Sequence, residues 1–194
     1  MAYQLLIPPW TWIGDTQMLS FPQNIPVIVE WVVDQMFDGG INSVCDIGCG
    51  MGKYGLLIKE RYLSRRAEQN FYPKWDKTLI GIEDNSFFFE NSPLEKIYDR
   101  AYFRNAIGNG VPEADLYLII DVCEHYMRDN FEAFVDTLIG KTVLVSTPKR
   151  TVMYTEPYYG DPRHHITQFT AEDFDGWNVN LSTEQSWIFA MTAR

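Results

Sequence analysis

The stretch from Ser43 to Gly55, SVCDIGCGMGKYG, combines an acid with closely spaced glycines. An apolar run ends beside Asp46, and Gly48, Gly50 and Gly52 follow at alternate positions before a second apolar run. Glycines can adopt positive φ and let a ligand approach the backbone, while N–H groups at the start of a helix point into the same space. The pattern predicts a strand, a tight loop and a helix around a nucleotide-like ligand, and Asp46 favours one that carries an amine.

A second acidic pair follows the next predicted strand. Residues 78–82 are apolar and lead into Glu83-Asp84, after a helix expected to run from the glycine loop to about Leu63. The locally basic stretch 61–77 between them is interpreted as a helix end and a solvated loop, although it could also meet a phosphate. Strand, glycine loop, helix and strand make a βαβ unit, whose terminal acid lies where a ribose would bind.

The remaining chain alternates apolar strands with amphipathic helices. Helices are expected over 24–38, 86–97 and 121–139, the last with an apolar face, and Thr170 with Asp173 predicts a helix N-terminus. The expected strands are 41–47, 78–82, 98–103, 116–120, 142–146 (ended by Pro148), 177–181 and 187–192. This order predicts an α/β fold with a seven-stranded, mostly parallel sheet, helices on both faces, and ligands beyond the carboxyl ends of the strands.

Residues 1–23 do not follow this pattern, and we expect them to form an N-terminal arm before a single domain at 24–194. The arm contains three prolines together with Trp10 and Trp12 and has no helical or strand period. Its aromatic side chains could pack against the domain, or they could cover the ligand as a lid. The sequence leaves both roles open.

Composition limits the partners and the compartment. With 194 residues, 46% hydrophobic and 22% charged, the chain is expected to be globular and long enough for one core. A net charge of −10 disfavours a surface that tracks nucleic-acid phosphates and favours a small or neutral substrate. Three cysteines without paired spacing, no apolar run of 18 residues and no leader pattern predict a cytoplasmic protein that does not enter a membrane.

Two motifs narrow the ligand. Residues 50–55 match the dinucleotide pattern G-x-G-x-x-G, but Asp46 stands where a dinucleotide site needs no acid. The segments V-C-D-I-G-C-G-M-G and G-I-E-D resemble the first and second motifs of class I S-adenosylmethionine-dependent methyltransferases, which implies their Rossmann-like fold and their cofactor. Asn105-Ala106 stands where an acid-Ala pair often meets the adenine, and Asn can still bond to an amine. The cofactor-binding residues that the resemblance implies are Asp46, Gly48, Cys49, Gly50, Gly52, Glu83, Asp84, Asn105, Ala106 and Asp121.

The second half of the chain resembles particular branches of that family. The segments I-I-D-V-C-E-H, V-L-V-S-T-P and H-H-I-T-Q-F-T-A-E-D-F are similar to ubiquinone-type O-methyltransferases and to the 2′-O-methyltransferases of small-RNA 3′ ends. The resemblance implies a divalent metal, Mg, Mn or Zn, held by Asp121, Glu124, His125 and His165, with Asp121 in place of the usual Glu. The candidate catalytic residues are Asp121, His125 and His165, and either histidine could act as the base for the accepting hydroxyl if no metal is bound.

Helical spacing supports part of this metal site. If 121–139 is an α-helix, the side chains at 121, 124 and 125 point within an arc of about 100° and can converge on one ion. The chain's three histidines, 125, 164 and 165, all fall in this region. Alternatively, Asp121 and Glu124 merely favour a helix N-terminus and His125 packs beneath the long loop.

The sequence therefore predicts a methyltransferase that acts on an oxygen, with three hypotheses for its biology. A small-molecule acceptor agrees best with the acidic charge. An RNA 2′-O-methyltransferase agrees with the motifs but not with the charge of −10. A non-catalytic subunit that binds S-adenosylmethionine and regulates a partner would keep the fold without the chemistry. The oligomeric state does not follow from the sequence.

Overall fold

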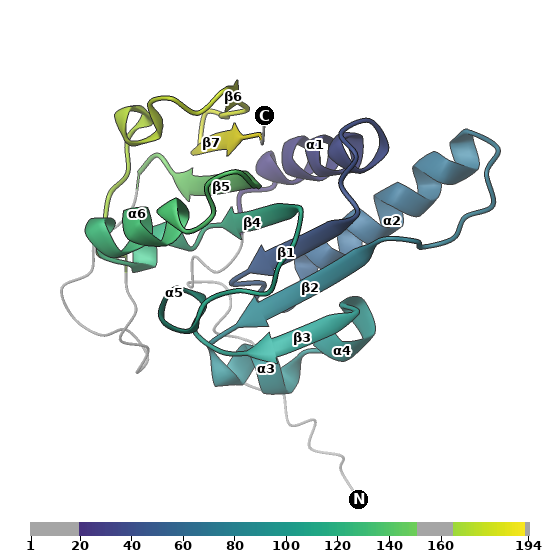
Figure 1. Cartoon of the computed structure of the whole chain (residues 1–194), viewed down its shortest axis with the longest axis horizontal. Coiled ribbons are helices and arrows are strands. Elements are labelled where there is room, and N and C mark those ends of the chain that lie inside the picture. The colour runs from purple at the N-terminus through teal and green to yellow at the C-terminus, as the bar shows by residue number, and fades with distance from the viewer. Residues whose placement is uncertain (1–19, 151–164, 193–194) are drawn as a thin grey trace, which may run out of the picture.

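The computed structural model describes residues 20–150 and 165–192; the expectations for Trp10, Trp12 and His164 lie outside these ranges. Within them, seven strands form one sheet in the order β3-β2-β1-β4-β5-β7-β6 (Figure 1). Strands β1 to β5 are parallel, β7 is antiparallel to β5, and β6 is antiparallel to β7. The strands are β1 (Ser43–Ile47), β2 (Thr78–Glu83), β3 (Arg100–Phe103), β4 (Leu116–Ile120), β5 (Thr142–Pro148), β6 (Val179–Asn180) and β7 (Ser186–Met191). The predicted mostly parallel seven-stranded sheet is confirmed.

Helices cover both faces of this sheet, as predicted (Figure 1). Helices α1 and α2 lie together on one face, whereas α5 and α6 lie on the other. In α1 the buried apolar residues recur every three or four positions, which places them on one stripe toward the sheet. The helices are α1 (Asn24–Phe37), α2 (Lys53–Glu68), α3 (Ser86–Asn91), α4 (Leu94–Ile97), α5 (Ala106–Asn109) and α6 (Arg128–Asp136).

Strand β4 divides two apolar cores. Leu116 and Leu118 belong to the core beneath α1 and α2, whereas Tyr117 and Ile119 belong to the core beneath α6. Successive side chains of a strand point to opposite faces, so a run of apolar residues serves both cores. Each large aliphatic side chain buried in this way contributes about 1.5–3 kcal/mol to stability.

The strand order places a ligand crevice beside β1. The chain leaves β1 toward β2 and β3, and then crosses back to add β4 on the other side of β1. In open α/β sheets, ligands bind at the carboxyl ends of the strands where the order reverses. The loops after β1 and β4 therefore meet at the position where a ligand is expected.

The segment after β4 differs from its prediction, because residues 121–127 are not α-helical. Asp121 has a left-handed φ of 54°, and its N–H donates to the carbonyl of Ser146. A short 3₁₀ helix, η2 (Cys123–His125), follows, and Tyr126 is extended before α6 begins. The expected helix over 121–139 is wrong at its start, so the argument from α-helical spacing at 121, 124 and 125 does not hold.

Several other helix and strand boundaries differ from those predicted. The expected helix over 86–97 is two helices, α3 and α4, separated at Ser92-Pro93, and α2 runs on to Glu68 instead of ending near Leu63. Pro148 does not end β5 early, because it is the last strand residue and pairs with Ser186 of β7. The predicted N-terminus at Thr170 is confirmed for the 3₁₀ helix η3 (Ala171–Phe174).

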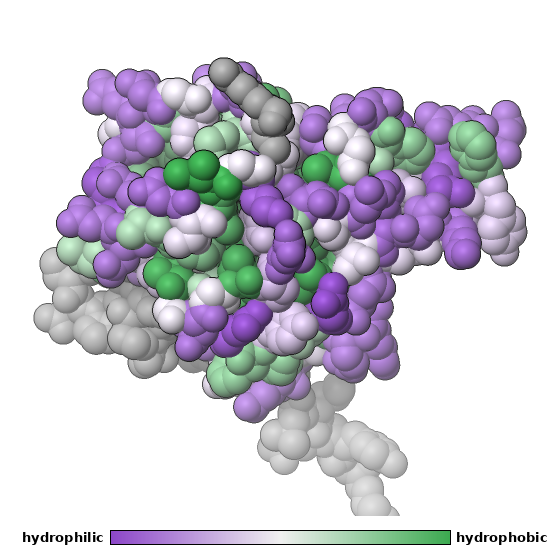
Figure 2. All heavy atoms as spheres, in the orientation of Figure 1, coloured by the Kyte–Doolittle hydropathy of each residue, from purple (hydrophilic) through white to green (hydrophobic). Residues whose placement is uncertain are grey.

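The molecular face in Figure 2 is mostly hydrophilic, with hydrophobic residues in small areas near its centre. Most large apolar side chains of the two cores are buried beneath it. In residues 20–150 and 165–192, no helix has both the length and the apolar composition needed to cross a bilayer.

Candidate functional site

The glycine loop connects β1 to α2, and each of its three glycines has a positive φ. The values are 69° at Gly48, 54° at Gly50 and 84° at Gly52. A Cβ atom on Gly48 would lie 2.4 Å from Val122, and one on Gly52 would lie 2.7 Å from a methyl carbon of Ile97. Beside Gly50, by contrast, the position of a Cβ atom has no heavy atom within 4 Å. Two glycines thus allow close packing, while Gly50 leaves space where a ligand can approach the backbone.

Glu83 fixes this loop from the end of β2. Its Oε2 accepts a hydrogen bond of 2.7 Å from the N–H of Gly50. Its Oε1 accepts hydrogen bonds from the N–H groups of Asp84, at 3.0 Å, and Asn85, at 2.8 Å. The carboxylate is buried and organises the backbone of two loops at once.

Asp46 lies inside the sheet, one residue before the end of β1. It is 2% exposed, and its Oδ2 accepts a hydrogen bond of 2.6 Å from the hydroxyl of Tyr98. Burial raises the pKa of Asp46 to about 7; the Tyr98 hydrogen bond acts against this rise and the charge of Glu83 adds to it. The ionised fraction of Asp46 therefore changes with pH near neutrality.

Asn105 joins the predicted adenine position to the acidic pair after β2. Its Nδ2 donates to Asp84 at 3.0 Å and to the hydroxyl of Tyr126 at 3.3 Å. Its Oδ1 accepts from the N–H of Gly108 at 2.8 Å and so caps α5. Ala106 and Cys49 are buried as well, but they belong to different apolar cores. The sequence did not single out Tyr126, whose role depends on the extended turn after η2.

Asp121 occupies a different place from the one predicted. Its carboxylate accepts a hydrogen bond of 3.1 Å from the hydroxyl of Ser146 on β5 and a second from Ser20. Burial raises the pKa of Asp121, against the effect of these hydrogen bonds and of the positive charge of Lys53. Burial lowers the pKa of Lys53, and Asp121 opposes that change. Lys53, the first residue of α2, and Asp121 thus stabilise each other's charges. The position of Lys53 in the glycine motif did not predict this interaction.

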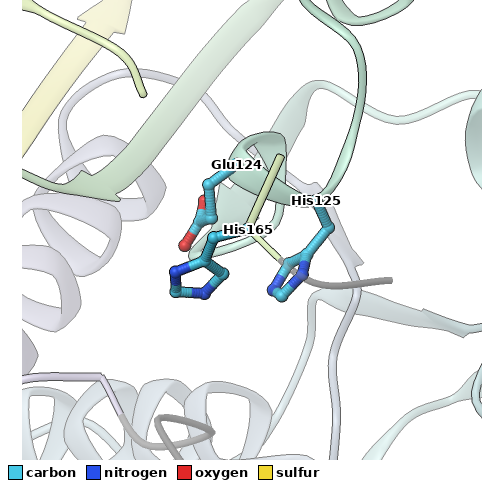
Figure 3. Close-up of side chains that lie close together, drawn as sticks. All are labelled: Glu124, His125 and His165. Carbon is cyan, nitrogen blue, oxygen red and sulfur yellow. The ribbon is translucent and has the colours of Figure 1, made fainter. Parts of the chain in front are cut away.

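Glu124, His125 and His165 form a compact cluster (Figure 3). One ligand atom from each of these side chains lies within 4.8 Å of those from the other two, and the imidazole rings stand edge to face with centroids 4.8 Å apart. Three of the four predicted metal ligands therefore come together. Asp121 lies outside this group, because its left-handed backbone and its hydrogen bond to Ser146 replace the helical position assumed for it.

Backbone hydrogen bonds hold the two halves of this cluster together. The N–H groups of Ile166 and Thr167 donate to the carbonyl of Glu124 at 2.8 and 3.2 Å. The Thr167 hydroxyl donates to the carbonyl of Tyr126 at 2.6 Å. These hydrogen bonds hold residues 166–167 against η2, and so they place His165 beside the side chains of Glu124 and His125.

Glu124 is the most buried member of the cluster, with an exposure of 1%. Burial raises its pKa to about 8, and the nearby charge of Asp121 adds to this rise. A carboxyl group in this state holds a proton near neutral pH unless a cation replaces it. The cluster has the donor types of a mixed oxygen and nitrogen metal site.

The seven-stranded sheet and the helices on its two faces form the Rossmann-like fold of S-adenosylmethionine-dependent methyltransferases, as comparison with solved structures shows. No protein-family model matches the sequence, and no curated protein sequence matches it either. Solved structures do match. The methyltransferase domain of bacterial CtHen1 aligns with 86% of this chain and 97% of its own, with 17% identity and a TM-score of 0.55.

Two further structures share the fold. Magnesium protoporphyrin IX methyltransferase (ChlM) from Synechocystis PCC 6803, solved with bound SAH, aligns with 94% of this chain and 92% of its own, with 15% identity and a TM-score of 0.57. Mitomycin 7-O-methyltransferase MmcR aligns with 89% of this chain and 54% of its own, with 12% identity and a TM-score of 0.58. These similarities establish the fold and leave the acceptor open.

Proposed function

We propose that this chain is an S-adenosylmethionine-dependent methyltransferase that methylates an oxygen of a small molecule. One observation carries the proposal: the glycine loop, Glu83 and Asn105 converge at the carboxyl ends of neighbouring strands and are joined by hydrogen bonds. A cofactor made of an amino acid joined to a nucleoside needs three such groups in a row, one each for its amino-acid part, its ribose and its base. The shared methyltransferase fold supports the same assignment.

The residues fit this cofactor better than a dinucleotide. The carboxylate of Asp46 suits an amine, and the carboxylate of Glu83, at the end of β2 beside the glycine loop, suits a ribose hydroxyl. Asp84, linked to Asn105, can accept from the amine of adenine. A pyrophosphate would instead place negative charge beside Asp46 and Glu83, which is unfavourable.

The cluster of Glu124, His125 and His165 fits a divalent cation. Two imidazoles and one carboxylate suit Zn or Mn, and Mg less well, because softer nitrogen ligands outnumber the oxygen. Three protein ligands leave coordination positions for an acceptor. A bound ion would lower the pKa of the accepting hydroxyl.

The chain's own residues would orient the acceptor. Lys53 directly follows the glycine loop, and Asp121 interacts electrostatically with both Lys53 and Glu124, so Asp121 and Lys53 would flank the transferring methyl group. Holding the hydroxyl oxygen in line with that group supplies most of the rate enhancement. If no metal binds, His125 or His165 would accept the hydroxyl proton as a general base.

The net charge favours one class of acceptor over the other. A chain with a net charge of −10 repels a polyphosphate backbone, so a small molecule is the favoured substrate. An RNA 2′-O-methyltransferase is the second candidate, because the motifs after β4 and β5 resemble that group. A regulator without catalysis is the third.

Release of S-adenosylhomocysteine tests these alternatives. The protein would be incubated with S-adenosylmethionine and Mn²⁺, with catechols and vicinal diols in one series and short single-stranded RNA in another. We expect turnover with a small hydroxylated acceptor, and its loss with chelator. Turnover with RNA alone would select the second candidate. Cofactor binding without turnover in either series would favour the regulator, and absence of cofactor binding would contradict the proposal.

A further inference from the structure

Tyr98 occupies a slot that two glycines leave open. It is 3% exposed and follows α4, and its N–H donates to the carbonyl of Leu94 at 2.8 Å. A Cβ atom on Gly55 of α2 would lie 2.6 Å from the Tyr98 ring, and one on Gly81 of β2 would lie 2.8 Å from it. Contacts this short mean that any larger residue at either position would displace the ring. The slot therefore requires glycine on two separate elements.

The slot leads the ring to Asp46. Gly81 is the direct partner of Asp46 in the parallel register of β1 and β2. Neighbours in register point to the same face of a sheet, so a side chain at 81 would stand beside the carboxylate. Because Gly81 has none, the Tyr98 ring lies in that place and its hydroxyl donates to Asp46 Oδ2 at 2.6 Å.

We propose that Tyr98 is a positioning residue for the cofactor: its hydroxyl holds one oxygen of the buried Asp46 carboxylate, so that the other is presented to the cofactor amine. The proposal depends on the proposed function, since it assigns the amine to Asp46. A hydrogen bond to an ionised carboxylate also favours the ionised form, and burial works in the opposite direction. Tyr98 thus increases the ionised fraction of this buried acceptor at neutral pH.

Other groups around Asp46 do not replace this effect. Three other titratable groups interact electrostatically with Asp46: the thiols of Cys45 on β1 and Cys49 in the glycine loop, and the hydroxyl of Tyr54 on α2. Burial raises the pKa of each, so they remain neutral. The negative charge of Glu83 on β2 disfavours a second negative charge on Asp46. Tyr98 is therefore the neighbour that stabilises the charge of Asp46.

The test compares Tyr98→Phe with Tyr62→Phe. Tyr62 is also 3% exposed, and its hydroxyl also donates to a carboxylate at 2.6 Å, but that carboxylate is Asp76, beyond the amino ends of the strands. Both variants remove a hydroxyl that donates to a carboxylate from a ring that is itself 3% exposed, so Tyr62→Phe controls for the loss of such a hydrogen bond. Affinity for S-adenosylhomocysteine would be measured by calorimetry from pH 6 to pH 9, and the Asp46 carboxyl would be titrated by carbon NMR in the free protein.

We expect Tyr98→Phe to raise the Asp46 titration midpoint by roughly one pH unit, while Tyr62→Phe leaves it in place. A rise of that size from about 7 lowers the ionised fraction at pH 7 and weakens cofactor binding roughly fivefold, with recovery toward pH 9. An equal loss at every pH, or an unmoved Asp46 midpoint, would reduce Tyr98 to a packing residue and overturn the inference. A shifted midpoint with unchanged cofactor affinity would overturn the assignment of the amine to Asp46.

A measurement on the wild type does not depend on how the variant folds. The Tyr98 ring signals should move with the Asp46 titration, and the pH midpoint of S-adenosylhomocysteine affinity should coincide with it. Separate midpoints would contradict the inference. If the wild type binds no S-adenosylhomocysteine while the Asp46 and Tyr98 signals titrate together, the proposed function fails and the inferred role of Tyr98 fails with it, although their coupling stands.

Discussion

The imidazole rings of His125 and His165 stand edge to face with centroids 4.8 Å apart, although one follows β4 and the other lies beyond β5. The pair is kept in place by the hydrogen bonds of Ile166 and Thr167 to the backbone of Glu124. Together with Glu124 they bring two imidazoles and one carboxyl group within 4.8 Å of one another, which are the donor types of a mixed nitrogen and oxygen metal site. The pair is the strongest structural reason to expect a metal.

Removing the buried carboxylate should remove metal binding. Glu124→Gln deletes an anionic ligand and should lower Mn²⁺ or Zn²⁺ affinity by at least tenfold, because each ligand contributes directly to the coordination shell. Asp129→Asn, at an exposed acid in the first turn of α6, is the matched control and should bind metal normally. Calorimetry with each metal would measure both. Equal affinity of Glu124→Gln and wild type would contradict the site.

Metal affinity should rise with pH. The pKa of Glu124 is raised to about 8, mainly by burial, so below that pH the carboxyl group must release a proton before it can bind a cation. Affinity should therefore increase by up to about tenfold per pH unit below 8 and level off above it. Calorimetry in buffers with different ionisation enthalpies would detect the released proton. An affinity independent of pH between 6 and 8 would contradict this account.

The acid at the end of β2 should control cofactor affinity. Glu83→Ala removes the acceptor for the N–H of Gly50 and for a ribose hydroxyl, and should weaken S-adenosylhomocysteine binding by about 1–3 kcal/mol. Glu90→Ala, at an exposed acid of α3, is the control and should bind the cofactor as the wild type does. A loss of the same size in both variants would assign the effect to net charge.

The N-terminal arm should become protected when the cofactor binds. Ser20, which directly follows residues 1–19 in the sequence, donates a hydrogen bond to Asp121 at the site. The first 23 residues contain no Lys or Arg, and chymotrypsin, which cleaves at aromatic residues such as Trp10 and Trp12, is therefore the suitable protease. We expect slower cleavage and altered tryptophan fluorescence with S-adenosylhomocysteine. Unchanged cleavage would leave the arm to ordinary packing.

The sequence predicted the fold well because its signals are local. The apolar run of β4, the alternate glycines after β1 and the acid after β2 each act within a few residues, and their order implies the βαβ unit. Boundaries failed where tertiary contacts decide the backbone. Asp121 adopts a left-handed conformation while its N–H bonds to Ser146 on β5, and a pattern within residues 121–139 carries no sign of that contact.

The candidate site shows the same division. Gly50 and Glu83 lie close together, as expected for motifs that follow neighbouring strands. The direct hydrogen bond from the N–H of Gly50 to the Glu83 carboxylate, however, does not follow from either motif. Tyr98 escaped prediction, because its role depends on the missing side chains of Gly55 and Gly81 on two other elements. A residue whose role depends on several distant positions leaves no periodic signal in one sequence.

Calorimetric titration of the wild-type protein with S-adenosylhomocysteine and, separately, with NADH tests the central claim most directly. Asp46 and Glu83 bracket the glycine loop with acids that suit an amine and a ribose and that disfavour a pyrophosphate. The account predicts saturable binding of S-adenosylhomocysteine and much weaker binding of NADH. Tighter binding of NADH, or no binding of S-adenosylhomocysteine, would contradict it.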